Sequence, residues 1–218
     1  MKKEDRKNTI QRYTDRLQKH GYSEETLGWS RNKNDVRFAA LIAEWKDELQ
    51  GASIGDFGCG FGDLYGYLIE EVKLSGIQYT GIDINDRLVE VGKQKYPEAD
   101  FWVGDIIEDG FDQQFDFIFS SGVFNHKLSN GNEYGFIREC LEKINALTTK
   151  GFAVNFLSDK VDFQHEHTFH SNPGKILDMV YAFSNYVVLR NDYMPFEFTV
   201  YVRKDKGIDP EKIIYKNS

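Results

Sequence analysis

Residues 56–62 read Asp56-Phe57-Gly58-Cys59-Gly60-Phe61-Gly62, and this stretch decides the fold. Three glycines at alternate positions allow the backbone to turn sharply and to approach a ligand that side chains would exclude. Residues 52–55 suit a β-strand, and Leu64, Leu68 and Val72 recur at helical spacing after the glycines. The stretch therefore predicts a strand, a tight turn and a helix whose start faces a nucleotide-like ligand.

The spacing of the glycines narrows the kind of ligand. A dinucleotide fingerprint has its third glycine at the sixth position, and that position, counted from Gly58, is Asp63. This bulky charged residue argues against a nicotinamide-dependent oxidoreductase, as does the lack of a second core pattern for a separate substrate domain. The pattern Asp-x-Gly-x-Gly-x-Gly instead resembles motif I of class I S-adenosylmethionine-dependent methyltransferases. The resemblance implies that the loop holds a cationic amino acid moiety and not a pyrophosphate.

Two aspartates stand at the ends of the next two predicted strands. Asp83 follows residues 77–82, and a carboxylate there is placed to accept two hydrogen bonds from a ribose diol. Asp105 follows residues 101–103, where an acceptor can take an adenine amino group and Ile106 can cover the ring. Each aspartate alone is an ordinary polar residue at a strand end. Together, and after that glycine loop, they favour an adenosyl ligand.

Strand and helix patterns alternate after the glycine loop, which predicts a parallel sheet with helices on both faces. Asn172 and Pro173 predict a helix cap and a first-turn proline. Residues 186–189 and 196–202 are joined by too few residues for a crossover helix, so they predict a terminal antiparallel hairpin. The expected fold is therefore α/β, with a Rossmann-like, seven-stranded, mostly parallel sheet that resembles the class I methyltransferase fold.

The resemblance extends over residues 25–203 and implies roles for particular side chains. The glycine loop and Asp56 would hold the methionyl group, and Ser121 would lie beneath the sulfonium. Residues 27–38 resemble a segment that precedes motif I, in which Trp29 would close over the cofactor and Arg37 would pair with its carboxylate. A packing tryptophan and a surface arginine are the alternatives. The predicted cofactor-binding residues are Trp29, Arg37, Asp56, Gly58, Cys59, Gly60, Gly62, Asp83, Ile84, Asp105, Ile106 and Ser121.

The segment of residues 120–126, after the fourth predicted strand, is expected to meet the transferable methyl group and the acceptor. It does not match the Asn/Asp-Pro-Pro-Tyr motif of enzymes that methylate nucleic-acid bases or glutamine. Methyl transfer from a sulfonium needs alignment and shelter from water more than acid–base machinery. A general base would help an acceptor that must lose a proton, and His126 and Asn125 are the candidate catalytic residues. A loop histidine without a chemical role is the alternative.

Residues 158–170, after the fifth predicted strand, have the most unusual composition in the chain. Their expected place over the site predicts a cap that recognises the substrate. The segment contains His165, His167 and His170, whose alternating and threefold spacing in a loop defines no coordination geometry. We therefore predict no metal site, and binding of substrate or metal by these histidines stays open.

Composition limits the class of protein. The chain has 218 residues, 40% of them hydrophobic, which suits one sizeable core. Its net charge of −8 argues against a nucleic-acid partner, because binding to phosphates requires clustered cations. Two isolated cysteines, no apolar run of a signal peptide and no long apolar stretch predict a cytoplasmic protein without a membrane partner. We expect a helical extension or lid in residues 1–50, a core in residues 51–203 and a charged tail in residues 204–218.

The sequence thus predicts an enzyme that binds S-adenosylmethionine and methylates a small-molecule acceptor by in-line displacement. The alternative is a regulatory or assembly module that binds S-adenosylmethionine without catalysis. The identity of the acceptor, the methylated atom and the oligomeric state are not indicated by any motif.

Overall fold

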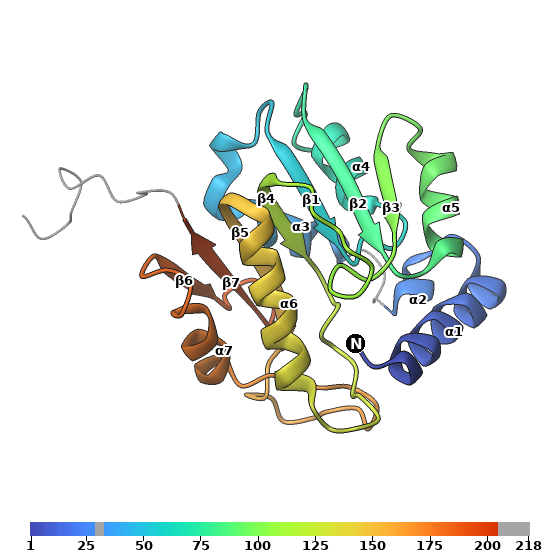
Figure 1. Ribbon diagram of the computed structural model, residues 1–218, viewed down its shortest axis with the longest axis vertical. Helices are drawn as coiled ribbons and strands as arrows, with labels where there is room; N and C mark the ends of the chain where they lie inside the picture. Colours follow the sequence, from blue (N-terminus) through green and yellow to red (C-terminus); the bar gives the residue numbers. More distant parts are fainter. Residues whose placement is uncertain (29–32, 205–218) are drawn as a thin grey trace, which may run out of the picture.

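The sheet of the protein confirms the predicted architecture. The computed structural model describes residues 1–28 and 33–204, and within them one seven-stranded sheet has the order β3-β2-β1-β4-β5-β7-β6 (Figure 1). The strands are β1 (Ser53–Phe57), β2 (Gln78–Asp83), β3 (Asp100–Val103), β4 (Phe115–Ser120), β5 (Thr148–Leu157), β6 (Val187–Arg190) and β7 (Glu197–Arg203).

Strands β1 to β5 run parallel to one another, and β7 pairs antiparallel with both β5 and β6. The predicted terminal hairpin is therefore correct. The chain order reverses between β1 and β4, so the carboxyl ends of these two strands flank a crevice in which α/β proteins bind ligands. The register pairs Asp56 of β1 with Gly81 of β2 and Phe119 of β4.

Helices cover both faces of the sheet (Figure 1). One hydrophobic cluster packs α6 and α7 against the sheet, and a second packs α3, η1 and α4 on the opposite side. The predicted cap of α7 is present, because the Asn172 side chain accepts a hydrogen bond from the backbone N–H of Lys175. The helices are α1 (Lys3–His20), α2 (Glu24–Leu27), α3 (Asn34–Ile42), η1 (Ala43–Glu48), α4 (Asp63–Glu70), α5 (Asp86–Lys95), α6 (Glu133–Leu147) and α7 (Pro173–Val180).

The segment before β1 forms two consecutive helices, α3 and the 3₁₀ helix η1. Trp45 departs from helical geometry with φ −124° and ψ 15°, and its ring is fully buried against Phe117, Phe119 and Tyr201. Burial of so large a ring outweighs the regularity of one helical turn. The division of the chain at residue 50 stays a prediction, but α3 and η1 are built into the core and only α1 extends over its edge.

Arg37 of α3 is not a surface residue. It is 4% exposed and its guanidinium donates three hydrogen bonds of 2.6–3.0 Å to the carboxylate of Glu197 at the start of β7. The Asn155 amide donates a further bond, of 3.3 Å, to the same carboxylate. This bidentate pair joins α3 to the hairpin next to the crevice.

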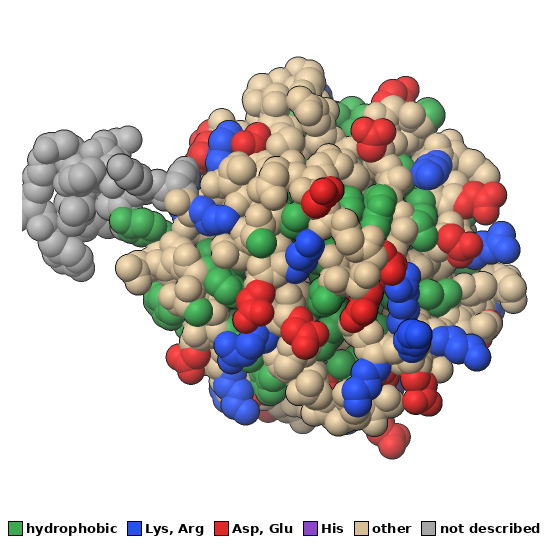
Figure 2. All heavy atoms as spheres, viewed as in Figure 1, with side chains coloured by type: hydrophobic (Ala, Val, Ile, Leu, Met, Phe, Trp, Pro, Cys, Tyr) green, Lys and Arg blue, Asp and Glu red, His purple; other side chains and the backbone are tan. Residues whose placement is uncertain are grey.

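The molecular surface mixes charges of both signs. On the face drawn in Figure 2, Lys and Arg side chains at the lower right lie over the region of α1, with acidic side chains among them. Among the residues that the structure describes, none of the helices has the length and apolar character required to cross a membrane.

Replacement of Arg37 by methionine is expected to lower the free energy of unfolding by about 3–5 kcal/mol, because Glu197 keeps a buried charge without its counter-ion. The matched control is Arg87→Met, whose partner Glu90 lies 3.6 Å away with both side chains 62% exposed. That control should cost less than about 1 kcal/mol. Urea unfolding compares the two variants, and equal losses would show that the Arg37–Glu197 pair is not buried in solution.

Candidate active site at the carboxyl ends of the strands

The glycine loop joins β1 to α4 through backbone conformations that favour glycine. Gly58 and Gly60 have φ of +76° and +55°, and a Cβ at Gly58 would overlap the Val123 side chain. The backbone N–H groups of Gly58 and Cys59 donate to the Ile82 carbonyl oxygen at 2.8 and 3.1 Å. The loop is therefore held against the end of β2, with its backbone open to the crevice.

Asp83 ends β2 and supports the same loop. Its Oδ2 accepts a hydrogen bond of 2.9 Å from the Gly60 N–H, and its Oδ1 accepts one of 2.9 Å from the Asn85 N–H. Burial raises the pKa of Asp83, and these N–H groups act in the opposite direction. Each carboxylate oxygen has a second lone pair, which leaves Asp83 able to accept hydrogen bonds from a ligand.

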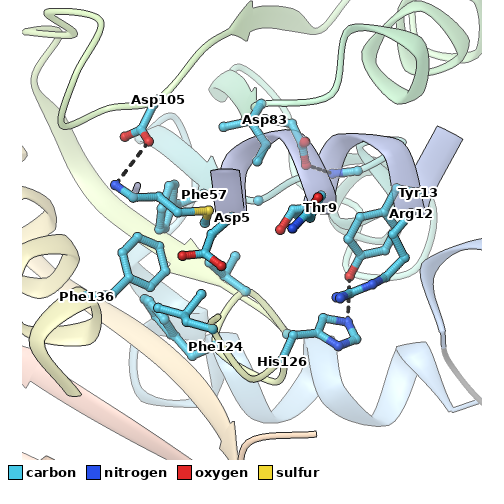
Figure 3. A pocket seen from close by; sticks show the side chains of 18 of the residues that line it. Asp5, Thr9, Arg12, Tyr13, Phe57, Asp83, Asp105, Phe124, His126 and Phe136 are labelled. Carbon is cyan, nitrogen blue, oxygen red and sulfur yellow. Dashed lines mark hydrogen bonds and ion pairs between the residues drawn. The ribbon is translucent and has the colours of Figure 1, made fainter. Parts of the chain in front are cut away.

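A cavity of about 340 Å³ lies over these strand ends, within the size range of small-molecule sites. Among the predicted residues, it is lined by Gly58, Gly60, Asp83, Ile84, Asp105, Ser121 and His126. Asp105 lies at one end of the cavity, and His126 lies at the other (Figure 3). The structure thus brings together residues from the ends of β1, β2, β3 and β4.

Helix α1 forms the wall of the cavity that the sequence did not reveal. Asp5, Thr9, Arg12 and Tyr13 of this helix point into it (Figure 3). Asp5 Oδ2 and Arg12 Nη1 are buried without a hydrogen-bond partner in the described part of the chain. Because a buried polar atom without a partner costs free energy, these two atoms are available for polar groups of a ligand.

Three sets of contacts hold α1 in this position. The Asn85 side chain donates to the Ile10 carbonyl oxygen at 3.0 Å and to Thr14 Oγ1 at 3.2 Å. Arg6 pairs with Asp109 at 2.7 Å, and Asp5 Oδ1 accepts a bond of 2.8 Å from the Ser129 N–H. These contacts reach the segments after β2, β3 and β4, so α1 spans the mouth of the crevice. The action of this helix as a lid stays a prediction.

His126 lies where the cavity meets a second, larger one. Its Nε2 is 3.3 Å from the Tyr13 hydroxyl, and its Nδ1 is buried without a hydrogen-bond partner in the described residues. Burial lowers the pKa of His126 to about 4, and the charge of Arg12 acts in the same direction. The imidazole is therefore neutral near pH 7, able to accept a hydrogen bond but only weakly basic.

The second cavity, of about 640 Å³, lies under the segment that follows β5. This segment contacts the segment after β4, because the backbone N–H groups of Phe169 and Lys127 donate to the Asn125 and His167 carbonyl oxygens. The rings of Phe163, His165, His167 and His126 follow one another, with centroids 4.9–6.2 Å apart. Residues 158–170 therefore form a wall of this cavity, next to His126.

The predicted histidine cluster does not gather metal ligands. Within residues 1–28 and 33–204, no group of three His, Cys, Asp or Glu side chains is placed to hold a metal ion. His170 instead places Nδ1 2.7 Å from the Ser158 carbonyl oxygen and Nε2 3.1 Å from Thr168 Oγ1. Both ring nitrogens of His170 therefore contact residues of the same segment, residues 158–170.

Several predicted residues lie beside the first cavity and do not line it. Asp56, Cys59 and Ile106 are buried, and Gly62 caps α4. Arg37 lines the second cavity, where its charge is balanced by Glu197. Asn125 also lines the second cavity, but its Oδ1 accepts a hydrogen bond of 3.3 Å from the Leu157 N–H. Trp29 lies outside the described residues. The cofactor and catalytic roles of these residues stay predictions.

Asp56 is the buried carboxylate closest to the glycine loop in sequence. Its Oδ2 accepts a hydrogen bond of 2.6 Å from the Tyr79 hydroxyl. Burial raises its pKa from 3.8 to about 7, although the Tyr79 hydroxyl acts in the opposite direction. The folded state therefore binds a proton that the unfolded state releases between these pH values, and Asp56 lowers the free energy of unfolding as the pH rises through this interval.

The variant Asp56→Asn should remove this pH dependence, because the amide does not titrate and still accepts from Tyr79. The free energy of unfolding of the variant, relative to the natural protein, is expected to rise between pH 4 and pH 7 and to level off above. Urea unfolding at four pH values in this range measures the difference. A difference that stays constant with pH would contradict a protonated Asp56 in the fold.

Comparisons with known proteins agree with this arrangement. Residues 54–147 match a family model described as a methyltransferase domain. The chain is 31% identical over 160 residues to a protein of Mycobacterium tuberculosis that bears the name putative methyltransferase Rv1506c, and the match covers 70% of this chain and 93% of that protein.

Solved structures share the fold. Magnesium protoporphyrin IX methyltransferase from Synechocystis, crystallised with bound SAH, superposes with a TM-score of 0.63 and 16% identity over 90% of this chain and 99% of the other. Human N-acetylserotonin methyltransferase, in complex with SAM, gives a TM-score of 0.66 and 18% identity over 93% of this chain and 59% of the other. The chain therefore belongs to the class I S-adenosylmethionine-dependent methyltransferase superfamily, because it matches the M. tuberculosis protein over most of both chains and matches the methyltransferase family model.

Proposed function

We propose that the protein binds S-adenosylmethionine in the first cavity and transfers its methyl group to a small molecule in the second. The single observation that carries this proposal is the junction of the two cavities. Tyr13, Leu27, Gly122 and His126 line both of them, so the two cavities adjoin at the segment after β4.

The first cavity fits an adenosyl sulfonium. We assign the adenine to the end at Asp105, where Asp5 Oδ2 is a second buried acceptor. We assign the ribose to Asp83 and the methionyl group to the open backbone at Gly58 and Gly60. We assign Arg12, whose Nη1 is buried without a partner among the described residues, as the partner of the cofactor carboxylate. The sequence had suggested Arg37 for this role, but Arg37 pairs with Glu197.

When bound, the cofactor supplies an electrophilic methyl group on a sulfonium. The new bond joins the nucleophilic atom of the acceptor to the methyl carbon, while the bond from carbon to sulfur breaks and sulfur keeps the electron pair. Helix α1 and the segment after β5 form walls beside this junction, which would limit the access of water to it. His126 orients the acceptor by accepting a hydrogen bond from it and is only a weak base, and Asn125 positions His126 through the hydrogen bond that holds the loop to β5.

The two similar solved structures do not indicate an acceptor for this chain, because N-acetylserotonin and magnesium protoporphyrin IX differ greatly in size. The size of the second cavity, about 640 Å³, with α1 and residues 158–170 as two of its walls, favours a small-molecule acceptor. The rival interpretation, a module that binds the cofactor without turnover, predicts no methylation of any compound in a broad panel assayed with methyl-labelled S-adenosylmethionine.

Replacement of Asp83 by alanine should weaken S-adenosylmethionine binding by on the order of 10- to 100-fold, because charge-assisted hydrogen bonds to the ribose are lost. Calorimetry measures the affinity. The matched control is Asp86→Ala, which removes the same charge from an exposed position three residues later and should bind as the natural protein does. Unfolding curves check that both variants fold. Absence of binding by the natural protein, or equal affinity of the two variants, would contradict the assigned site.

A further inference from the structure

Two arginines of α1 face the junction of the two cavities. Arg12 lines the first cavity, and Arg16, one helical turn later, lines the second. Both are half-buried, and both lower the pKa of His126 as neighbouring positive charges.

Within residues 1–28 and 33–204, no carboxylate lies within ion-pair distance of the Arg12 or the Arg16 guanidinium, whereas Arg6, on the same helix, pairs with Asp109 at 2.7 Å. The net charge of the whole chain is −8, so two cations one helical turn apart beside the two cavities contrast with its overall acidity. Two positive charges in a partly desolvated environment repel each other, and a bound anion offsets this repulsion.

The remaining charged groups of the second cavity leave Arg16 uncompensated. Arg37 and Glu197 balance each other in a buried pair at 2.6 Å. Lys160 lies 3.3 Å from Asp159 with 70% of its side chain exposed, and Asp162 is exposed at the rim. The histidines that line the cavity, His126, His165, His167 and His170, contribute no fixed negative charge.

A sulfonium delivered to this junction adds a further positive charge. The carboxylate of the cofactor, as assigned above, accounts for Arg12, and Asp5, Asp83 and Asp105 supply negative charge to the first cavity. Arg16 lines only the second cavity, so an anionic group of the acceptor is the charge that would balance it there.

We propose that the acceptor carries an anionic group, a carboxylate or a phosphate, which binds Arg16 at the inner end of the second cavity. This proposal rests on the methyltransferase function proposed above and adds the chemical class of the acceptor. The apolar body of the acceptor lies outward, against the rings of Phe163, His165 and Phe196.

The chemistry of His126 agrees with such an acceptor. A neutral, weakly basic imidazole removes protons poorly from an alcohol or an ammonium group, whereas an oxygen that is already ionised attacks without a base. An anionic nucleophile and a cationic sulfonium also neutralise each other as the methyl group moves, which a partly desolvated junction favours.

The test uses the full chain saturated with S-adenosylhomocysteine and four probes of one shape. These are phenylacetate, phenyl phosphate, neutral phenylacetamide and cationic phenethylamine, each titrated by calorimetry at millimolar concentration. We expect at least one anion to bind about tenfold more tightly than the amide, and the amine to bind no better than the amide. Carboxylate and phosphate are distinguished by which of the two anions binds more tightly.

Substitutions of Arg16 test whether this residue causes the preference for anionic probes. Arg16→Gln should abolish the difference between the anion and the amide, and Arg16→Lys should restore part of it. The control Lys19→Gln makes the same change of charge at an exposed position of α1 and should keep the full difference.

The outcomes separate this proposal from the one it rests on. A protein that binds no S-adenosylhomocysteine overturns the proposed function and the acceptor class with it. A protein that binds the nucleoside but takes the amide or the amine as tightly as the anions overturns the acceptor class alone. Undetectable binding of both anions, or an anion preference that persists in Arg16→Gln, also overturns it.

Discussion

The site depends on the hydrogen bonds that hold the glycine loop against the end of β2. The N–H groups of Gly58 and Cys59 donate to the Ile82 carbonyl oxygen, and the Gly60 N–H donates to Asp83. Only glycine accepts the left-handed conformation at Gly58 and the close approach of Val123 there. These bonds keep the backbone open toward the ligand and place a carboxylate beside it, and the rest of the cavity is built around this pair of features.

Contacts between segments far apart in the sequence complete the site at the carboxyl ends of the strands. Helix α1, far from the glycine loop in sequence, reaches the ends of β2, β3 and β4 through Asn85, Asp109 and Ser129. It contributes polar atoms to both cavities, among them the guanidinium groups of Arg12 and Arg16. The same helix therefore encloses the cofactor cavity and sets the charge at its junction with the second cavity.

Local sequence was sufficient for the sheet and for the residues at the strand ends. Asp83, Asp105 and Ser121 could be predicted to lie near the crevice because each stands at the end of a strand or within two residues of it, and carboxyl ends of parallel strands meet at one edge. Arg37 and Arg12 could not be told apart in this way, because their partners, Glu197 and an open cavity, are distant in sequence. A signal was present in α1, where Asp5, Thr9, Arg12 and Arg16 recur at helical spacing, but the same pattern also describes a solvated face.

The most direct test of the central claim is a crystal structure of the protein with S-adenosylhomocysteine. The account predicts the ribose hydroxyls within hydrogen-bond distance of the Asp83 carboxylate, the adenine at Asp105 and the sulfur atom facing the space between Ser121 and His126. A nucleoside bound elsewhere, or one whose sulfur atom points away from the second cavity, would contradict it.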